Sequence, residues 1–176
     1  MKRSSGVLMH VTCLPGDHSS GSIGAAAREW IDLLSECGFS YWQVLPFCLP
    51  DEYNSPYKSY STFSGNPNFI DLERLAADGL ITFDELEHTK QATPYLCEFD
   101  RLSRERMTLL AKAAARFTDD AAMDDFFAAH PHTLRFCEFM ARKAANGMSE
   151  WMCWQSDVLD EQALRLWKFV QYTVFT

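Results

Sequence analysis

The residues best suited to contact a ligand are concentrated in one irregular stretch, Asn54 to Leu72, which reads NSPYKSYSTFSGNPNFIDL. Turn-forming Pro, Gly and Asn residues are interspersed there with many hydroxyl side chains. The same stretch carries four aromatic rings, those of Tyr57, Tyr60, Phe63 and Phe69. A loop selected only for flexibility needs neither feature. The stretch is either a ligand-binding loop or a tightly folded structural segment.

Other residue types that perform chemistry lack the spacing that the chemistry requires. Cys13 follows His10 closely, but nothing else resembles a thiol enzyme, so we interpret it as structural. The six cysteines form no CxxC pair, and their wide scatter among apolar neighbours predicts buried, reduced thiols rather than disulfides. The five histidines, including His130 and His132, show no metal-ligand spacing. We predict no metal and no cofactor. The acidic pairs Asp119/Asp120 and Asp124/Asp125 are interpreted as helix caps and solvated faces.

The composition limits the class of protein. The chain has 176 residues, 47% of them hydrophobic, which is enough for one domain with a core. A net charge of -8 argues against binding to nucleic acid. No apolar run is long enough to cross a membrane. The apolar run near the N-terminus is interrupted by Thr12 and Pro15 and has no cleavage site, so we expect no signal peptide and a cytoplasmic location.

A strand–helix–strand unit is predicted at the start of the chain. Residues 6–11 (GVLMHV) and 41–47 (YWQVLPF) are short, nearly continuous apolar runs, typical of strands buried on both faces. Between them, residues 23–38 have apolar positions at helical spacing, and Gly38 is suited to end the helix. Short connections make this a βαβ unit with parallel strands and a right-handed crossover.

The βαβ geometry places the opening stretch on the side where ligands are expected. In parallel α/β folds, ligands bind beyond the carboxyl ends of the strands. The Asn54–Leu72 stretch follows the carboxyl end of the second strand. It should therefore lie on the same side as His10 and Thr12, which end the first strand.

The second half of the chain is predicted to be helical. Residues 101–117, 133–147 and 160–175 have amphipathic patterns, and acidic connectors such as 118–126 (TDDAAMDDF) are interpreted as turns. No third strand is visible. Because two parallel strands cannot form a closed core, we expect the chain to be the N-terminal piece of a larger protein.

With these elements in place, several stretches resemble those of one family. In order they are GVLMHVTCLPG, GSIG, YWQVLP, NSPYKSYSTFSGNPNFIDLERLAADGL and, less closely, LWKFVQYTVF. They resemble the 4-alpha-glucanotransferases (amylomaltase or disproportionating enzyme), glycoside hydrolase family 77. The SPY…SxFxGNPxxIDLexL pattern with an upstream WQVLP is specific to that family. The chain departs from the usual family pattern at Val11, Cys13 and Lys58.

The resemblance implies a cytoplasmic glycosyltransferase on a (β/α)8 (TIM) barrel with helical insertions. Such enzymes cut an α-1,4-glucan, hold one part as a covalent glycosyl-enzyme, and pass it to the 4-hydroxyl of another sugar. The retaining chemistry uses two carboxyl groups about 5–5.5 Å apart. In the family these carboxylates lie on later strands that this chain does not reach. We therefore assign no catalytic residue here and expect the chain alone to be inactive.

The resemblance also implies a domain layout. Residues 1–81 would be the first strand–helix–strand of the barrel with the SPY loop, and residues 82–160 a helical insertion. Residues 161–176 would form a helix that leads back to the barrel. The expected fold is thus a partial (β/α)8 barrel, an α/β fold, whose partners are a maltodextrin or α-1,4-glucan and the remainder of its own barrel.

Four residues are predicted to bind the substrate. By resemblance, Ser55 and Tyr57 of the SPY motif lie beside the sugar at the cleavage point. An aromatic ring offers an apolar platform to the C–H face of a glucose, and a hydroxyl can bond to sugar hydroxyls. Asn66 either binds or braces the loop, and His10 is the weakest candidate. Pro56, Gly65, Pro67 and Asp71 suit turns and caps, whereas Phe63 and Phe69 are predicted to pack in the core.

Two readings from other classes stay open. The chain could be a noncatalytic sugar-binding module that keeps the aromatic loop without the carboxylates. Alternatively, its acidic helical half could be a protein-interaction bundle. Both conflict with the open edges of a two-stranded parallel sheet.

Overall fold

The computed structural model describes residues 3–18, 20–51 and 53–176. The chain folds as two compact units. The first unit consists of Met1–Phe47 and Asn68–Leu109, and the second of Cys48–Pro67 and Leu110–Thr176. The long helix α4 (Phe99–Arg116) begins in the first unit and ends in the second.

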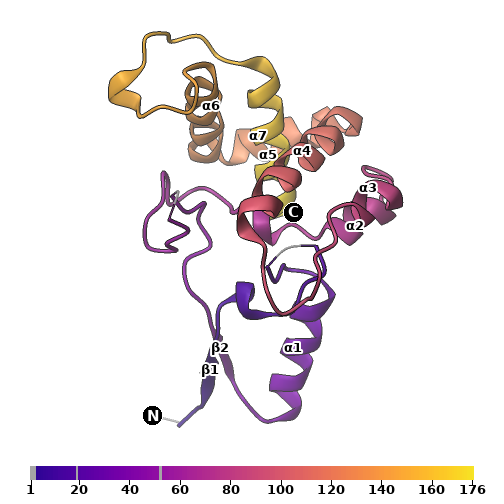
Figure 1. Ribbon diagram of the computed structural model, residues 1–176. Coiled ribbons are helices and arrows are strands. Elements are labelled where there is room, and N and C mark those ends of the chain that lie inside the picture. Colours follow the sequence, from indigo (N-terminus) through magenta and orange to yellow (C-terminus); the bar gives the residue numbers. More distant parts are fainter. Residues whose placement is uncertain (1–2, 19, 52) are drawn as a thin grey trace. The chain divides into compact units, whose positions relative to one another are not determined.

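The first unit opens with the predicted strand–helix–strand arrangement. Strand β1 (Gly6–Leu8) and strand β2 (Tyr41–Gln43) are parallel, and helix α1 (Ala25–Glu36) connects them (Figure 1). The register pairs Gly6 with Tyr41, Val7 with Trp42 and Leu8 with Gln43. Gly38, at φ +77°, follows the helix in the left-handed conformation that glycine adopts without strain. The prediction of a parallel βαβ unit is confirmed.

The prediction that both strands are buried on both faces is wrong. Each strand has only three residues, and Leu8 and Tyr41 are 62% and 65% exposed. The half-buried members are Val7 and Trp42, so burial alternates with the period of two that one covered face produces. A small core cluster of Val11, Leu14, Ala27 and Phe69 packs against this side, joined by partly buried Met9, Trp30, Trp42 and Val44.

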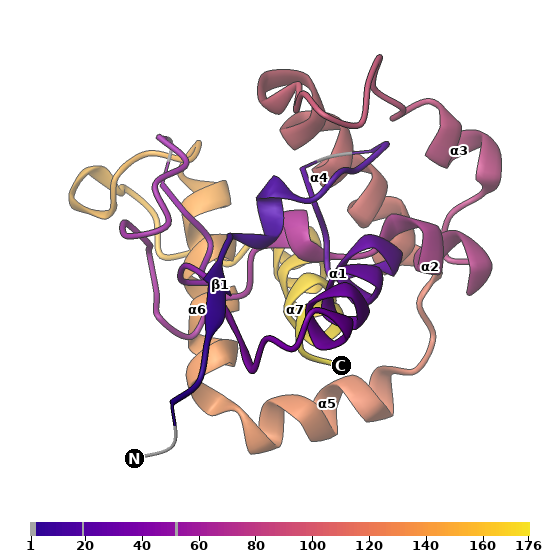
Figure 2. The same ribbon diagram turned by 90° about the horizontal axis from the view of Figure 1, so that it is seen from below.

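Short, well-capped helices complete the first unit. Helix α2 (Leu72–Ala77) and helix α3 (Phe83–Glu87) pack against each other (Figure 2). The carboxylate of Asp71 accepts hydrogen bonds from two backbone N–H groups at the start of α2, as its predicted role as a cap requires. Thr82 and Glu85 form a reciprocal capping box at α3. Two short 3₁₀ turns, η1 (Val11–Cys13) and η2 (Pro67–Phe69), precede these helices.

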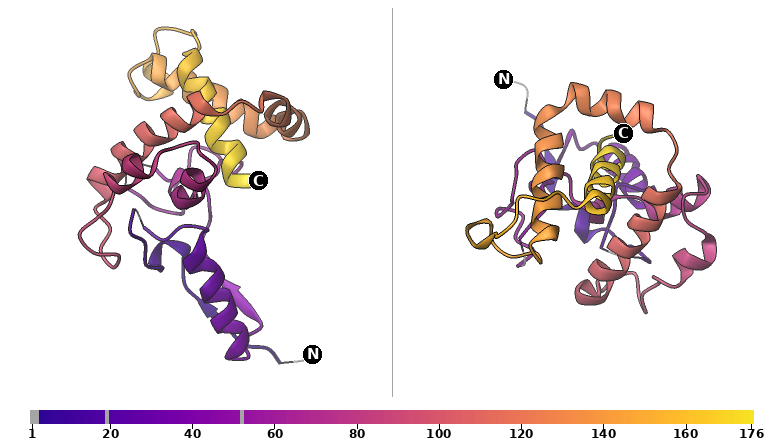
Figure 3. Two further views of the ribbon diagram at one scale, coloured as in Figure 1. Left: turned by 90° about the vertical axis from the view of Figure 1, so that its right-hand side faces the viewer. Right: turned by 90° about the horizontal axis from the view of Figure 1, so that it is seen from above.

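The second unit is helical. Helix α6 (Pro131–Ala145) and helix α7 (Glu161–Phe175) form its main packed pair, and helix α5 (Asp120–Ala129) contacts both. Figure 3 shows α5 and α6 meeting at a sharp angle. The rings of Phe136 and Trp167 meet edge to face at 5.6 Å, next to the fully buried Phe169 and Val170. The turn η3 (Trp151–Cys153) lies between α6 and α7.

The helical predictions are correct for the long amphipathic segments, whose observed ends fall within two residues of the predicted ones. The interpretation of residues 118–126 as turns is wrong, because α5 forms there. Asp119 caps that helix, as predicted. Asp120 and Asp124 form ion pairs with α7 residues Arg165 and Lys168, at 2.9 and 2.8 Å.

The cysteines are less buried than predicted. All six are free, but Cys13, Cys37 and Cys153 are exposed and only Cys137 is fully buried. Burial raises the pKa of the Cys137 thiol to about 12. An apolar sequence neighbourhood therefore predicted the burial of Cys137 correctly but not that of the other five cysteines. Among the described residues, no helix combines the length and apolar character needed to cross a bilayer.

Candidate functional site

Residues 48–51 and 53–67, which include the tip of the predicted binding loop, fold back on themselves within the second unit. Residues Pro50 and Ser59 form an isolated antiparallel bridge, and Asp51 N–H donates to the carbonyl of Lys58 at 3.0 Å. At the turn between them, Asn54 has φ +56° and donates its N–H to the carbonyl of Asp51. Asn tolerates this left-handed conformation better than most residues. The SPY motif therefore sits at the tip of a closed, hydrogen-bonded loop.

The loop tip presents two tyrosine rings to solvent, those of Tyr53 and Tyr57, each 74% exposed. Tyr57 is 74% exposed, while Ser55 is half-buried and its carbonyl accepts a hydrogen bond from Lys58 N–H at 3.1 Å. The ammonium of Lys58 lies 3.8 Å from the Asp51 carboxylate and 5.5 Å from the ring centroid of Tyr53. These contacts hold the tip without using the Tyr57 ring. The structure thus brings Ser55 and Tyr57 together in one turn.

Three serine hydroxyls of the loop, those of Ser59, Ser61 and Ser64, form hydrogen bonds inside the loop. Ser59 Oγ donates to the carbonyl of Ser61 at 2.9 Å, and Ser64 Oγ donates to the same carbonyl at 2.7 Å. Ser64 Oγ also accepts from Leu49 N–H at 3.0 Å. The high serine content therefore satisfies backbone groups in a segment without regular secondary structure. Sequence reasoning did not assign this role to these serines.

The end of the loop is anchored to helix α7. The Gln171 side chain is fully buried, and its amide bonds both backbone groups of Gly65. Gly65 also lies against Val174, where an added Cβ would stand 2.4 Å from a methyl carbon. Asn66, next in sequence, is only 6% exposed. Asn66 therefore lies in the anchored base of the loop, away from its exposed tip.

His10 belongs to the first unit, where it contacts two aromatic rings and one backbone N–H group. Its Nδ1 accepts a hydrogen bond from Leu45 N–H at 3.2 Å, and its ring meets those of Phe69 and Phe47 at 5.6 and 5.9 Å. Burial lowers the pKa of His10 below its usual range. A neutral imidazole with Nδ1 as acceptor carries its proton on Nε2. The Nε2–H group of His10 can therefore donate a hydrogen bond to a ligand.

An aromatic hollow of about 270 Å³ lies beside the loop in the second unit. Its lining includes Tyr60, Phe63, His132, Phe136 and Phe139. Phe63 stacks on His132 with ring centroids 4.8 Å apart and planes 18° apart. Phe63 is 52% exposed, so its predicted core position is wrong, whereas Phe69 is buried at 2% exposure as predicted. The partner ring comes from α6, 69 positions away, and no local pattern could indicate that pairing.

The arrangement is suited to bind rather than to perform covalent chemistry. The loop tip offers an apolar ring face, a hydroxyl on that ring and a nearby serine hydroxyl. This combination fits a ligand that has both C–H faces and hydroxyl groups. The carboxylate of Asp51 is held by its own loop through Tyr53 N–H and Lys58.

Comparisons with known proteins agree on one class. The sequence profile described as 4-alpha-glucanotransferase matches residues 9–174. A 4-alpha-glucanotransferase from Clostridium butyricum is 32% identical over 96% of this chain and 38% of its own length. One from Streptococcus pneumoniae (strain TIGR4) is 36% identical over 87% of this chain and 31% of its own. An amylomaltase from Streptococcus agalactiae, solved in complex with acarbose, matches with a TM-score of 0.91 and 29% identity, covering 99% of this chain and 39% of that one.

The chain belongs to the 4-alpha-glucanotransferase family, glycoside hydrolase family 77. It spans about a third of the length of the curated relatives that it matches. The resemblance of its motifs to this family is thereby confirmed.

Proposed function

We propose that this chain forms the N-terminal part of a 4-alpha-glucanotransferase. The whole protein would transfer α-1,4-glucan segments to the 4-hydroxyl of an acceptor glucose or glucan by a retaining double displacement. The observation that carries this proposal is the family match over residues 9–174. The amylomaltase from Streptococcus agalactiae was solved with acarbose, which supports a glucan-like ligand here as well.

In this proposal the chain contributes part of a (β/α)8 barrel. Residues 1–81 form the first strand–helix–strand with the SPY loop, residues 82–160 the helical insertion, and residues 161–176 the helix that returns to the barrel. The parallel pairing of β1 and β2 across α1 supports the barrel assignment. The remainder of the protein supplies the catalytic carboxylates, so the chain alone is inactive.

The proposed substrate contacts follow from exposure. Tyr57 provides the sugar platform, because it belongs to the SPY motif and its ring is 74% exposed. Ser55 supplies a hydroxyl in the same turn. His10 offers its Nε2–H, and the burial of Asn66 favours bracing of the loop over direct contact.

The proposed cellular setting is the cytoplasm, with maltodextrin or α-1,4-glucan as partner and neither nucleic acid nor membrane. A net charge of -8 supports the exclusion of nucleic acid, because phosphate backbones repel an acidic surface.

Disproportionation of maltotriose by the full-length protein tests this function. Incubation should produce glucose together with longer maltodextrins, as transfer requires. Release of glucose and maltose without longer products would instead indicate hydrolysis. If the protein binds maltotriose but leaves it unchanged, it is a noncatalytic sugar-binding module and the enzyme proposal is wrong.

A further inference from the structure

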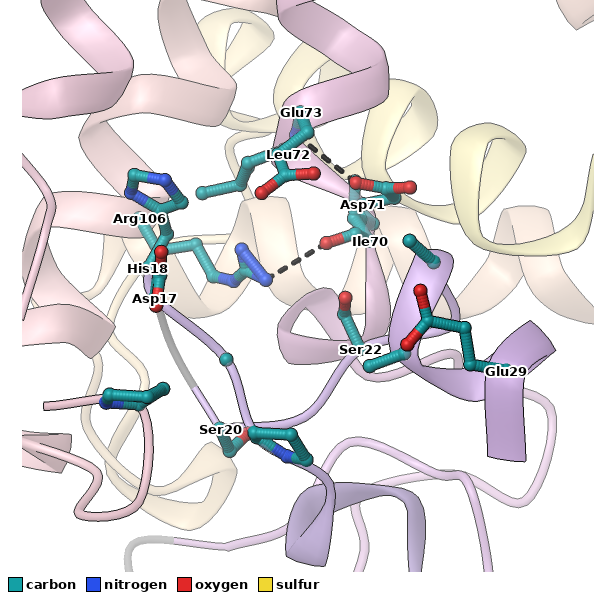
Figure 4. Close-up of a pocket in the computed structure, with 15 residues that line it drawn as sticks. Asp17, His18, Ser20, Ser22, Glu29, Ile70, Asp71, Leu72, Glu73 and Arg106 are labelled. Atoms are coloured by element: carbon teal, nitrogen blue, oxygen red, sulfur yellow. Dashed lines mark hydrogen bonds between the residues drawn. The ribbon is translucent and has the colours of Figure 1, made fainter. Parts of the chain in front are cut away.

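The first unit contains a cavity of about 360 Å³ that is lined in part by Ile70, Asp71 and Leu72, at the end of the Asn54–Leu72 stretch, but not by Ser55 or Tyr57. It lies between residues 15–18 and 20–29, the start of helix α2 and the buried side chain of Arg106 from α4 (Figure 4). The walls are tied together by backbone hydrogen bonds from Gly16 N–H to the Pro94 carbonyl at 3.1 Å and from Ile23 N–H to the Phe69 carbonyl at 3.0 Å. A cavity with fixed walls can select a ligand by shape.

Arg106 places a buried positive charge at this cavity. Arg106 is 2% exposed, and its Nη2 donates to the carbonyls of Asn68 and Ile70, each at 2.9 Å. Nε and Nη1 have no hydrogen-bond partner among the described residues. A guanidinium has five N–H donors, so three of them are left for a ligand.

The charge on Arg106 persists although the group is buried. Burial lowers the pKa of Arg106 to about 10, which leaves the guanidinium protonated at neutral pH. Buried guanidinium groups normally pair with a carboxylate or a phosphate. The carboxylate of Asp71 on the cavity wall interacts electrostatically with Arg106, but it uses its Oδ1 to cap α2. An anionic group on a ligand would supply the missing partner.

Other polar groups on the walls define the rest of the ligand. The hydroxyl of Ser20 is buried and also has no partner among the described residues. The carboxylates of Asp17, Glu29 and Glu73 line the outer part of the cavity, with Asp17 on one side in Figure 4 and Glu29 on the other. Carboxylates accept hydrogen bonds from hydroxyl groups but repel a ligand that is anionic throughout.

We propose that this cavity binds a small polyhydroxylated molecule that carries a single carboxylate or phosphate group. The anionic group bonds Nε or Nη1 of Arg106 and the hydroxyl of Ser20. The ligand hydroxyls donate to the outer carboxylates. The cavity volume agrees with this choice, since about 300 Å³ and above is typical of sites for whole small molecules.

Calorimetric titration of the full-length protein tests the proposal with four probes: glucose 1-phosphate, glucuronate, inorganic phosphate and glucose. Glucose 1-phosphate or glucuronate should bind at least about tenfold more tightly than either inorganic phosphate or glucose. This order of affinities would show that binding needs both the anionic group and the sugar hydroxyls. Equal weak binding of all four probes would overturn the proposal and leave a cavity filled by water.

Variants locate the binding. Ser20→Ala removes only the unpartnered hydroxyl and should weaken binding several-fold without loss of the fold. Arg106→Lys should abolish it, and Arg104→Gln, which removes an exposed charge from the same helix, should leave it unchanged. Binding that survives both Ser20→Ala and Arg106→Lys would contradict the assignment to this cavity. Maltotriose disproportionation plays no part in the readout, so the two proposals fail independently.

Discussion

The side chain of Gln171 forms two hydrogen bonds with the backbone of Gly65, although 106 positions separate them in sequence. Gly65 N–H donates to Oε1 at 2.6 Å, and Nε2 donates to the Gly65 carbonyl at 3.1 Å. The amide thereby replaces the pairing that a neighbouring strand would provide. Because both residues are buried, this pair fixes the base of the SPY loop on helix α7.

Replacement of that amide should destabilise the protein strongly. Gln171→Leu leaves both backbone groups of Gly65 buried without partners, and we expect the free energy of unfolding to fall by about 2–4 kcal/mol. Urea denaturation of the full-length protein measures it. Gln155→Leu, at an exposed position, is the matched control and should change stability by less than about 0.5 kcal/mol. Equal effects of the two substitutions would show that the amide pair does not anchor the loop.

The contact between Gly65 and Val174 should appear as coupling between two substitutions. Gly65→Ala places a Cβ 2.4 Å from a Val174 methyl carbon and 2.9 Å from its Cβ, so it should destabilise. Val174→Ala removes both methyl groups and should relieve part of that clash. The double variant should therefore be more stable than the sum of the single effects, by about 1 kcal/mol. Strict additivity in this double-mutant cycle would contradict the close approach.

The N-cap of helix α2, Asp71, should tolerate substitution by Asn but not by Ala. Asp71 Oδ1 accepts from the N–H groups of Glu73 and Arg74 at 3.1 and 3.3 Å. Asp71→Ala should cost about 1 kcal/mol of stability, whereas Asp71→Asn keeps an acceptor and should cost a few tenths. Asp78→Ala, at the opposite end of the helix, serves as the control. If Asn and Ala are equally damaging at position 71, capping is not the role of this residue.

Stability should decrease as the pH falls through the range in which histidine titrates. Burial lowers the pKa of His10 in the folded state, so the unfolded chain binds a proton more readily. The loss of stability begins near the ordinary histidine pKa of about 6.5 and ends below the folded-state value. Burial also lowers the pKa of His18, so this residue contributes to the same loss of stability at low pH.

A substitution separates the contribution of His10. His10→Asn keeps an acceptor for Leu45 N–H but does not titrate, so the variant should lose less stability than wild type between pH 7 and pH 5. The free energy of unfolding at several pH values measures the difference. A wild-type pH dependence in the variant would mean that His10 has the same pKa in the folded and unfolded states.

Local patterns were sufficient to predict the βαβ unit, the long amphipathic helices and the cap at Asp71. Each depends on residues within a few positions of one another. Helix α5 was missed because its acidic residues resemble a solvated connector, whereas Asp120 and Asp124 pair with Arg165 and Lys168, more than 40 positions away. Such pairings are not visible in a local pattern.

The same reason explains the limits at the site. The SPY motif indicated the loop, and the exposure of Tyr57 is compatible with its predicted role. The serine network and the Gly65–Gln171 pair depend on how the loop closes and on what it packs against. Phe63 stacks on His132 of α6 instead of entering the core, because the partner ring comes from a distant part of the chain.

The central claim is that Tyr57 at the tip of the SPY loop binds the sugar of a glucanotransferase. The most direct measurement is kcat/KM for maltotriose disproportionation by full-length Tyr57→Ala, compared with Tyr95→Ala, which removes another exposed tyrosine from the other unit. We predict a decrease of at least about 100-fold for Tyr57→Ala, close to 3 kcal/mol of lost transition-state binding, with an unchanged unfolding temperature. Tyr95→Ala should behave as wild type. Wild-type kcat/KM in the folded Tyr57→Ala variant would contradict the claim and make the loop a structural segment.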